Sequence, residues 1–226
     1  MTKIVTSLSG HLRLLKKRTY QTAVLLLMSC IMGGFKVARA QDLNKKFTVI
    51  NRIISLDRKS GVVHLNKAEG AGIAWINGQV FDKGVIEFDV KGKDEFQGSF
   101  LGIAFHGVND SIYESVYFRP FNFRSTDLGR KSHAVQYIAL PGYDWPKLRT
   151  GFPNQFEQLV LPAPDPNQWF HVKIIVAGEL VSVYVNNSKR PALKVKSLTR
   201  TGGKMIGYWV GNGADGNWRN LKISSE

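Results

Sequence analysis

Aromatic and hydrogen-bonding side chains are interleaved through residues 113–149, where the sequence is YESVYFRPFNFRSTDLGRKSHAVQYIALPGYDWPKLR. Sugars are bound by this mixture, because an apolar ring stacks on the C–H face of a sugar while planar polar groups hydrogen-bond its hydroxyls. The segment therefore predicts a carbohydrate-binding site. Its candidate ligand-binding residues are Tyr117, Arg119, Asn122, Arg124, Gln136, Tyr143 and Trp145.

Taken one at a time, these residues also fit ordinary roles, with the rings in the core and the arginines in surface ion pairs. As a set they favour function, because the mixture persists through a proline-interrupted loop where no core requires it. We expect Trp145 to stack on a sugar ring, with Arg119, Asn122 and Gln136 contacting its hydroxyls.

Glu114 and His106 are the candidate catalytic residues of an alternative, enzymatic function. Alternation along 113–119 places Tyr117 and Arg119 on one face of a strand and Glu114 on the other, with Val116. That second face is apolar, and a buried carboxyl group is a candidate for a general acid with a raised pKa.

A second acidic pair, Glu87 and Asp89, has the spacing that places two carboxylates on one face of a strand. Retaining glycoside hydrolysis needs such a pair about 5–5.5 Å apart. The corresponding glucanase-like pattern E-x-D-x-x-E requires a glutamate at position 92, where this chain has Gly92. A solvated strand face is therefore the preferred interpretation.

Metal and cofactor motifs are few. The histidines at 64, 106, 133 and 171 are scattered, without the close pair typical of metal ligands, and no metal-binding residues are predicted. Asn109–Asp110 and Asp215–Gly216–Asn217 are oxygen-rich turns that would suit a structural calcium ion, although turn geometry alone explains them. Neither a nucleotide-binding glycine loop nor a G-x-S-x-G elbow occurs.

The first 40 residues have the order of a secretory signal peptide: a basic and polar region over 1–21, an apolar stretch over 22–35, and Ala38-Arg39-Ala40 before Gln41. Fourteen helical residues span about 21 Å, which is less than the ~30 Å hydrocarbon core of a membrane. We therefore expect cleavage after Ala40, a mature domain over 41–226, export to the periplasm or the outside, and no membrane span.

Cys30, the one cysteine of the chain, leaves an alternative open. Leu27-Met28-Ser29-Cys30 loosely resembles a bacterial lipobox, in which an acylated Cys30 would anchor the protein to a membrane. If cleavage follows Ala40 instead, the mature protein has no cysteine, which excludes thiol catalysis there.

The net charge is +14, from 31 Lys and Arg against 17 Asp and Glu. Seven of the basic residues and none of the acidic residues lie in 1–40, so the expected mature chain carries only +7. With its lysines dispersed and the chain exported, nucleic acid is not an expected partner, whereas an anionic polysaccharide fits this charge.

Twelve short runs rich in β-branched and aromatic residues recur after the signal, separated by Gly, Pro, Asn and Asp clusters. They predict an all-β fold, an antiparallel two-sheet β-sandwich or jelly roll with at most one or two helical turns. The runs are 47–56, 61–66, 72–76, 84–92, 99–107, 112–120, 134–140, 169–178, 180–187, 192–197, 204–211 and 217–224. Turns are expected at Ala177-Gly178-Glu179 and Asn186-Asn187-Ser188, and residues 141–168, with six of the eight prolines, are expected to be irregular.

Six segments in order resemble the concanavalin A-like lectin/glucanase superfamily, in particular its laminin-G-like jelly rolls and the 3-keto-disaccharide hydrolase domain. They are GVIEFDVKG, GSFLGIAFHG, VYFRPFNF, HAVQYIAL, WFHVKIIVAGELVSVYVNN and GYWVGNGADGNWRNLKI. The resemblance covers about residues 47–224, and because these segments are structural it implies a fold more than an activity.

Three functions follow as expectations. The first is an exported protein that binds oligosaccharide or polysaccharide through the aromatic and polar site. The second is a glycoside hydrolase of the 3-keto-disaccharide hydrolase or glucanase kind, and the third is a structural or adhesive surface module.

Overall fold

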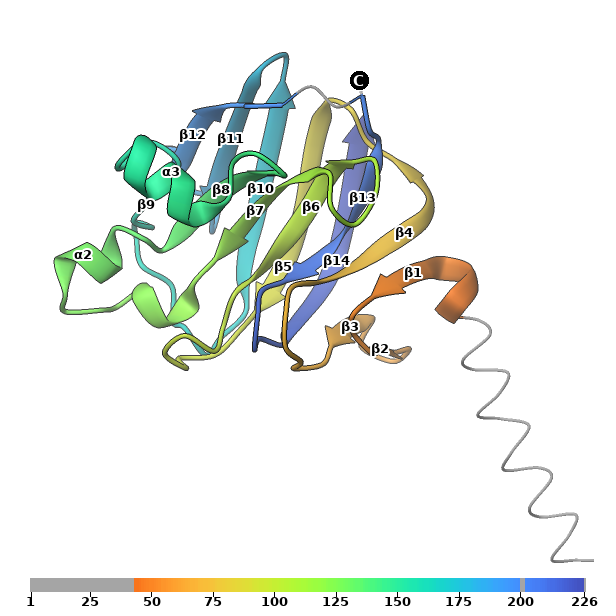
Figure 1. Cartoon of the computed structure of the whole chain (residues 1–226). Coiled ribbons are helices and arrows are strands. Elements are labelled where there is room, and N and C mark those ends of the chain that lie inside the picture. Colours follow the sequence, from red (N-terminus) through yellow and green to blue (C-terminus); the bar gives the residue numbers. More distant parts are fainter. Residues whose placement is uncertain (1–42, 200–201, 226) are drawn as a thin grey trace, which may run out of the picture. The chain divides into compact units, whose positions relative to one another are not determined.

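The structure is a computed structural model that describes residues 43–199 and 202–225 of the 226 (Figure 1). The expectations for the signal peptide at 1–40 and for Cys30 lie outside these described residues. Contacts divide the chain into the units Met1–Asn44 and Lys45–Glu226, and every strand described here belongs to the second unit.

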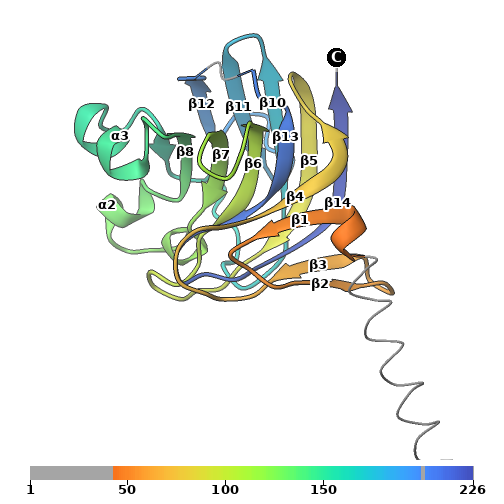
Figure 2. The same ribbon diagram turned by 45° about the vertical axis from the view of Figure 1, so that its right-hand side comes forward.

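Two antiparallel sheets face each other (Figures 1 and 2). The first sheet has the order β1 (Phe47–Ile50), β4 (Gly72–Val80), β13 (Met205–Val210), β6 (Leu101–Gly107), β7 (Tyr113–Phe118), β8 (Val135–Leu140) and β9 (Glu157–Gln158). The second has the order β12 (Leu193–Lys196), β11 (Leu180–Val185), β10 (Phe170–Ala177), β5 (Gly84–Lys91), β14 (Gly216–Ser225), β3 (Val62–Leu65) and β2 (Ile54–Asp57). The predicted fold class, an antiparallel two-sheet β-sandwich of jelly-roll type, is confirmed.

Side-chain alternation directs the core between the sheets. In β5, Ile86, Phe88 and Val90 are fully buried while the residues between them are partly exposed. Strands β10 and β11 follow the same pattern, and their buried residues include Val172, Ile174 and Val183. Because one face of each strand is apolar, a shift of register by one residue would expose the whole core set.

Both predicted turns are present. Gly178 has a φ of +60° between β10 and β11, and Asn186 and Asn187 have φ of +49° and +56° before β12. Glycine and asparagine are the residues that adopt this left-handed region at low cost.

The run 47–56 is not one strand. β1 pairs with β4 in the first sheet and β2 pairs with β3 in the second, so the chain changes sheets between them. Asn51, with a φ of +53°, lies in this connection. This division, together with the two-residue β9, raises the twelve expected strands to fourteen.

Residues 141–168 are more regular than expected, because they contain β9 and the helix α3 (Trp145–Gly151). Asp144 caps α3 by accepting a hydrogen bond from the Lys147 amide on its side chain, and Pro146 lies in the first turn. Proline is tolerated in the first turn because a backbone N–H at that position would have no acceptor inside the helix. A high proline content in 141–168 is therefore compatible with a helix.

Two further short helical segments, η1 (Pro120–Asn122) and α2 (Leu128–Lys131), follow β7, so residues 47–199 contain three helical segments where one or two were expected. Figures 1 and 2 show α2 and α3 beside the β8–β9 end of the first sheet. All six residues of β7 are buried, which shows that the first sheet is covered on both faces there.

Candidate functional site

One cross-strand row organises the outer face of the first sheet. Register pairs Trp209 of β13 with Gly102 of β6, Gly102 with Tyr117 of β7, Tyr117 with Gln136 of β8, and Gln136 with Glu157 of β9. Residues at matched register share a face of the sheet, so these side chains form one line across five strands.

Glycine at position 102 allows the two rings of this row to meet. A Cβ there would collide with the carbonyl oxygen of Val116 and the Cα of Tyr117. Without it, the rings of Tyr117 and Trp209 lie with centroids 4.7 Å apart. The Trp209 indole is held further by its Nε1, which donates to the Tyr113 hydroxyl at 3.0 Å.

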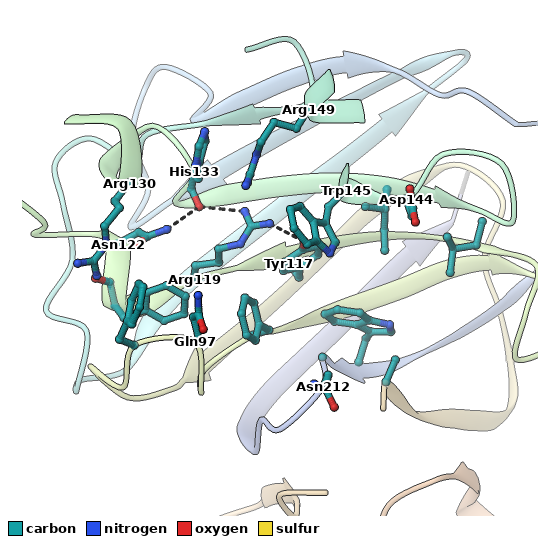
Figure 3. Close-up of a pocket in the computed structure, with 18 of the residues that line it drawn as sticks. Gln97, Tyr117, Arg119, Asn122, Arg130, His133, Asp144, Trp145, Arg149 and Asn212 are labelled. Atoms are coloured by element: carbon teal, nitrogen blue, oxygen red, sulfur yellow. Dashed lines mark hydrogen bonds between the residues drawn. The ribbon is translucent and has the colours of Figure 1, made fainter. Parts of the chain in front are cut away.

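A pocket of about 690 Å³ lies over this row (Figure 3). Its lining combines seven aromatic rings with guanidinium, imidazole, amide and carboxylate groups. The lining residues are Ala71, Phe96, Gln97, Phe100, Tyr113, Tyr117, Arg119, Phe121, Asn122, Arg130, His133, Ile138, Leu140, Asp144, Trp145, Arg149, Trp209, Gly211 and Asn212. This volume is in the usual range for small-molecule sites.

Arg119 is the most deeply buried cation of the pocket. Its Nη2 donates to the Tyr117 hydroxyl at 2.8 Å and to Gln136 Oε1 at 3.3 Å, and its Nη1 donates to the His133 carbonyl at 3.0 Å. Burial lowers the pKa of Arg119 and raises the pKa of Tyr117 to about 12, so the Tyr117 hydroxyl remains protonated at neutral pH. The guanidinium is thereby held rigidly in place.

Glu157, 3% exposed, lies beside two guanidinium groups and one imidazole ring of the pocket lining. Arg149 binds it through Nε at 2.7 Å and Nη2 at 2.6 Å. Arg119 Nη1 lies 3.6 Å away, and His133 Nε2 lies 3.3 Å away. This carboxylate joins β9, α3 and the residues flanking β8 into one electrostatic unit.

Two exposed rings flank the opening. Trp145, 45% exposed, lies at the start of α3 with the Arg149 Cζ 4.8 Å from its ring centroid. Phe96, 60% exposed, has the Arg130 Cζ 4.3 Å from its ring centroid. Because both rings belong to the lining of one pocket, they add exposed apolar surface at a single site, as binding sites do.

The structure brings together four of the predicted ligand-binding residues, because Tyr117, Arg119, Asn122 and Trp145 all line the pocket. The others lie elsewhere. Gln136 lies beneath it, buried, and donates to the carbonyl groups of Tyr137 and Phe156. The pocket lining does not include Arg124, which pairs with Asp165 at 3.2 Å, or Tyr143, whose ring lies 5.1 Å from Lys147 Nζ.

Several lining residues were not predicted. Phe96, Phe100, Trp209 and Asn212 come from segments far from 113–149, and the register of β13 with β6 is what brings Trp209 to Tyr117. Arg130, His133 and Arg149 lie inside the segment 113–149 but are not among the predicted ligand-binding residues. The signal that could have identified them is the concentration of basic side chains between residues 119 and 149.

Glu114 and His106 do lie together, but on the inner face of the sheet, away from the pocket. Glu114 is fully buried and accepts hydrogen bonds from Tyr137 Oη at 2.6 Å and Ser197 Oγ at 2.9 Å. His106 Nδ1 lies 2.9 Å from Glu114 Oε1, and its Nε2 lies 2.5 Å from the Asp82 carbonyl oxygen.

This inner cluster shifts the pKa of His106. Burial alone would lower that pKa, but the hydrogen bonds to Glu114 and to the Asp82 carbonyl outweigh burial and raise it above the ordinary value. Neither Glu114 nor His106 belongs to the pocket lining. The cluster joins β6, β7, β8 and the residues after β12 at one end of the sandwich.

The other candidate groups form ordinary pairs. Glu87 lies 3.4 Å from Lys173, and Asp89 binds His171 at 2.9 Å on the outer face of the second sheet. Asp215 pairs with Lys93 at 2.6 Å, and the Asn109 side chain accepts from the Ser111 amide in its own turn. Over residues 43–199 and 202–225, no three His, Cys, Asp or Glu side chains are grouped as a metal site would require.

The fold can be compared with known proteins. No protein-family model matches the chain, and no curated protein sequence matches it. The structure is similar to the carbohydrate-binding module CBM66 from Bacillus subtilis, with a TM-score of 0.55 and 13% identity over 78% of this chain and 94% of that one. It also resembles a candidate glycosyl hydrolase from Parabacteroides distasonis, with a TM-score of 0.50 and 14% identity over 77% and 90% of the two chains.

A third similar structure is a protein of unknown function with a galectin-like fold from Bacillus subtilis, with a TM-score of 0.50 and 14% identity over 78% of this chain and 88% of that one. The chain therefore shares the two-sheet jelly-roll fold of these structures, which is the fold that the sequence predicted. Among the described residues, none of the helices has the length and apolar character needed to cross a membrane.

Proposed function

We propose that this chain is an exported carbohydrate-binding protein whose ligand occupies the pocket over the first sheet. The observation that carries the proposal is the lining itself, in which exposed and buried aromatic rings enclose rigidly held hydrogen-bond donors. Similarity to a carbohydrate-binding module agrees with this proposal at the level of the fold.

The aromatic and the polar residues of the lining suit the C–H face and the hydroxyl groups of a sugar, respectively. Trp145 presents an exposed ring for the C–H face, and Phe96 is a second exposed ring of the same lining. Arg119 and Asn122 are buried and already hydrogen-bonded, so a ligand that contacts them loses little of their side-chain entropy. Preorganised polar groups beside stacking rings are what selective sugar binding requires.

Binding is favoured over hydrolysis by the position of the carboxylates. Glycosidases use two carboxyl groups on opposite sides of the scissile bond. Asp144 is the one carboxylate in the lining formed by the described residues, and its Oδ1 caps α3. Glu114 lies inside the sandwich and Glu157 is held by Arg149, so neither is presented to a glycosidic bond.

A glycan array probed with the purified domain 41–226, followed by calorimetry on each hit, tests the proposed function. We expect saturable binding to at least one oligosaccharide. Incubating each hit with the protein and analysing the products by mass spectrometry then separates binding from cleavage. Shortened products would favour the glycoside hydrolase alternative, and an array without any hit would contradict the proposal.

Export is the second part of the proposal. Its support is the order of the first 40 residues, with Ala38-Arg39-Ala40 at the end. Mass spectrometry of the protein from its native host should give a mature N-terminus at Gln41. An N-terminus at an acylated Cys30 would contradict this and place the protein on a membrane.

A further inference from the structure

The basic residues at one end of the pocket carry more positive charge than the carboxylate beside them neutralises. Two guanidinium groups, those of Arg119 and Arg149, share the single carboxylate of Glu157. Arg119 and Glu157 are almost completely buried and the Arg149 side chain is 33% exposed, so water screens this excess charge only in part. Arg130 adds a third guanidinium to the same lining. A buried positive excess costs free energy until an anion approaches it.

We propose that the pocket binds a sugar that carries a carboxylate, a uronic acid, with that carboxylate seated against Arg119, Arg149 and His133. This inference rests on the proposed carbohydrate-binding function and names the class of sugar. It assigns the anionic group to one end of the pocket and the ring stacking to Trp145.

The guanidinium geometry suits a planar carboxylate. Arg149 uses Nε and Nη2 for Glu157, so its Nη1 side can donate to a ligand. Arginine forks match the two oxygens of a carboxylate better than they match a single hydroxyl. A neutral sugar would leave the positive excess of this end without compensation.

The pocket is also polarised along its length. In Figure 3, Arg119, Arg130, Arg149 and His133 lie toward one end, while Asp144 lies toward the other. A carboxylate at the basic end and hydroxyl groups donating to Asp144 would orient the sugar in one direction. Trp145 lies between Arg149 and Asp144 in the same view, where a ring could stack on the middle of the ligand.

His133 links this binding to pH. Burial lowers its pKa, Glu157 partly restores it, and the positive charges of Arg149 and Arg119 lower it further, while Asp127 before α2 acts in the opposite direction. A carboxylate placed beside this ring would raise its pKa, so binding would take up a proton. Because sugar carboxylates stay ionised above about pH 5, affinity should increase as the pH falls from 8 toward 6.

Matched acidic and neutral probes test the inference by isothermal titration calorimetry. Oligogalacturonate, oligoguluronate and oligoglucuronate are each compared with the same oligosaccharide after reduction of its carboxyl groups. At least one acidic member should bind at least tenfold more tightly than its reduced partner. Arg149→Gln should remove that preference, so that the acidic probe and its reduced partner bind this variant with similar affinity.

A second variant and a matched control guard against misfolding. Arg130→Gln should also weaken binding of the acidic probe, and Arg190→Gln, which removes the same charge from an exposed turn of the second sheet, should not. Circular dichroism melting identifies any variant that does not fold. His133→Asn should bind the acidic probe with an affinity that no longer rises at low pH.

The outcomes separate the two proposals. Equal affinity for acidic and reduced probes, or binding of neutral glycans alone, would overturn the uronic acid inference and leave carbohydrate binding intact. Tighter binding of sulfated than of carboxylated probes would overturn the choice of carboxylate. No binding of any glycan would overturn the proposed function itself.

Discussion

The rings of Tyr117 and Trp209 lie 4.7 Å apart because the residue between them in the cross-strand row is Gly102. Tyr117 and Trp209 come from strands that are not neighbours, and any side chain at 102 would separate them. Their contact forms part of the apolar floor of the pocket, while Arg119 binds the Tyr117 hydroxyl beside it.

Gly102→Ala should therefore destabilise the protein by about 2 kcal/mol, because the added methyl group collides with backbone atoms of β7 that do not readily move. Urea denaturation measures the loss. Gly151→Ala is the matched control, since a Cβ at that position of α3 meets no atom within 4 Å. Equal stability of the Gly102→Ala variant and the parent would contradict the proposed packing of the floor.

Trp145→Ala should weaken carbohydrate binding by about 1–3 kcal/mol, the usual loss for one aromatic anchor. Its melting temperature should change little, because the side chain is 45% exposed. Leu161→Ala, which truncates an exposed apolar side chain outside the pocket lining, should change neither quantity. A large fall in melting temperature with unchanged affinity would instead show that Trp145 is a structural residue.

Glu157→Gln should lower the free energy of unfolding by about 3 kcal/mol, because it removes the carboxylate that compensates two guanidinium groups. Chemical denaturation at pH 7 tests this. Glu95→Gln removes an exposed partner of Lys67 and should leave the midpoint almost unchanged. Similar midpoints for both variants would show that Glu157 does not hold the basic end together.

The His106–Glu114 pair should make stability depend on pH. The folded pKa of His106 is raised, so its contribution is complete below the unfolded value of about pH 6.5 and is lost as the pH rises through the folded pKa. His133, with its lowered pKa, contributes the opposite slope below that pH. Comparing the protein with His106→Asn isolates the first effect, and asparagine tolerates the φ of +51° at this position.

Denaturation midpoints at several pH values between about 6 and 8 measure this difference. The stability advantage of the parent protein over His106→Asn should shrink as the pH rises. An advantage that stays constant across this range would show that His106 is not charged in the folded protein.

The sandwich was predictable because local sequence patterns identify its strands and turns. Alternation along β5 identifies Ile86 and Phe88 as core, and Asn186 and Gly178 mark turns by residue type alone. The change of sheet at Asn51 did not follow from local pattern, because only the two polar residues Asn51 and Arg52 interrupt the β-rich run 47–56 and such a pair also occurs within single strands. Only the separate pairing partners of the two strands divide that run.

Twelve of the nineteen lining residues lie in the segment 113–149, where alternation correctly places Tyr117 and Arg119 on one face. The remainder depends on register. Trp209 reaches the site through the pairing of β13 with β6, and Glu157 through the pairing of β9 with β8. Such pairings join residues 40 or more positions apart or lie in a proline-rich segment, and local patterns do not encode them.

The strand order has a consequence for how the chain folds. The two strands that come latest in the described sequence are internal: β13 lies between β4 and β6, and β14 lies between β5 and β3. Neither sheet can complete its strand pairing without β13 and β14. Folding therefore depends on contacts between residues far apart in the sequence, and proteins with many such contacts fold slowly. A nascent chain ending before Met205 would expose unpaired edges in both sheets, and such edges promote aggregation.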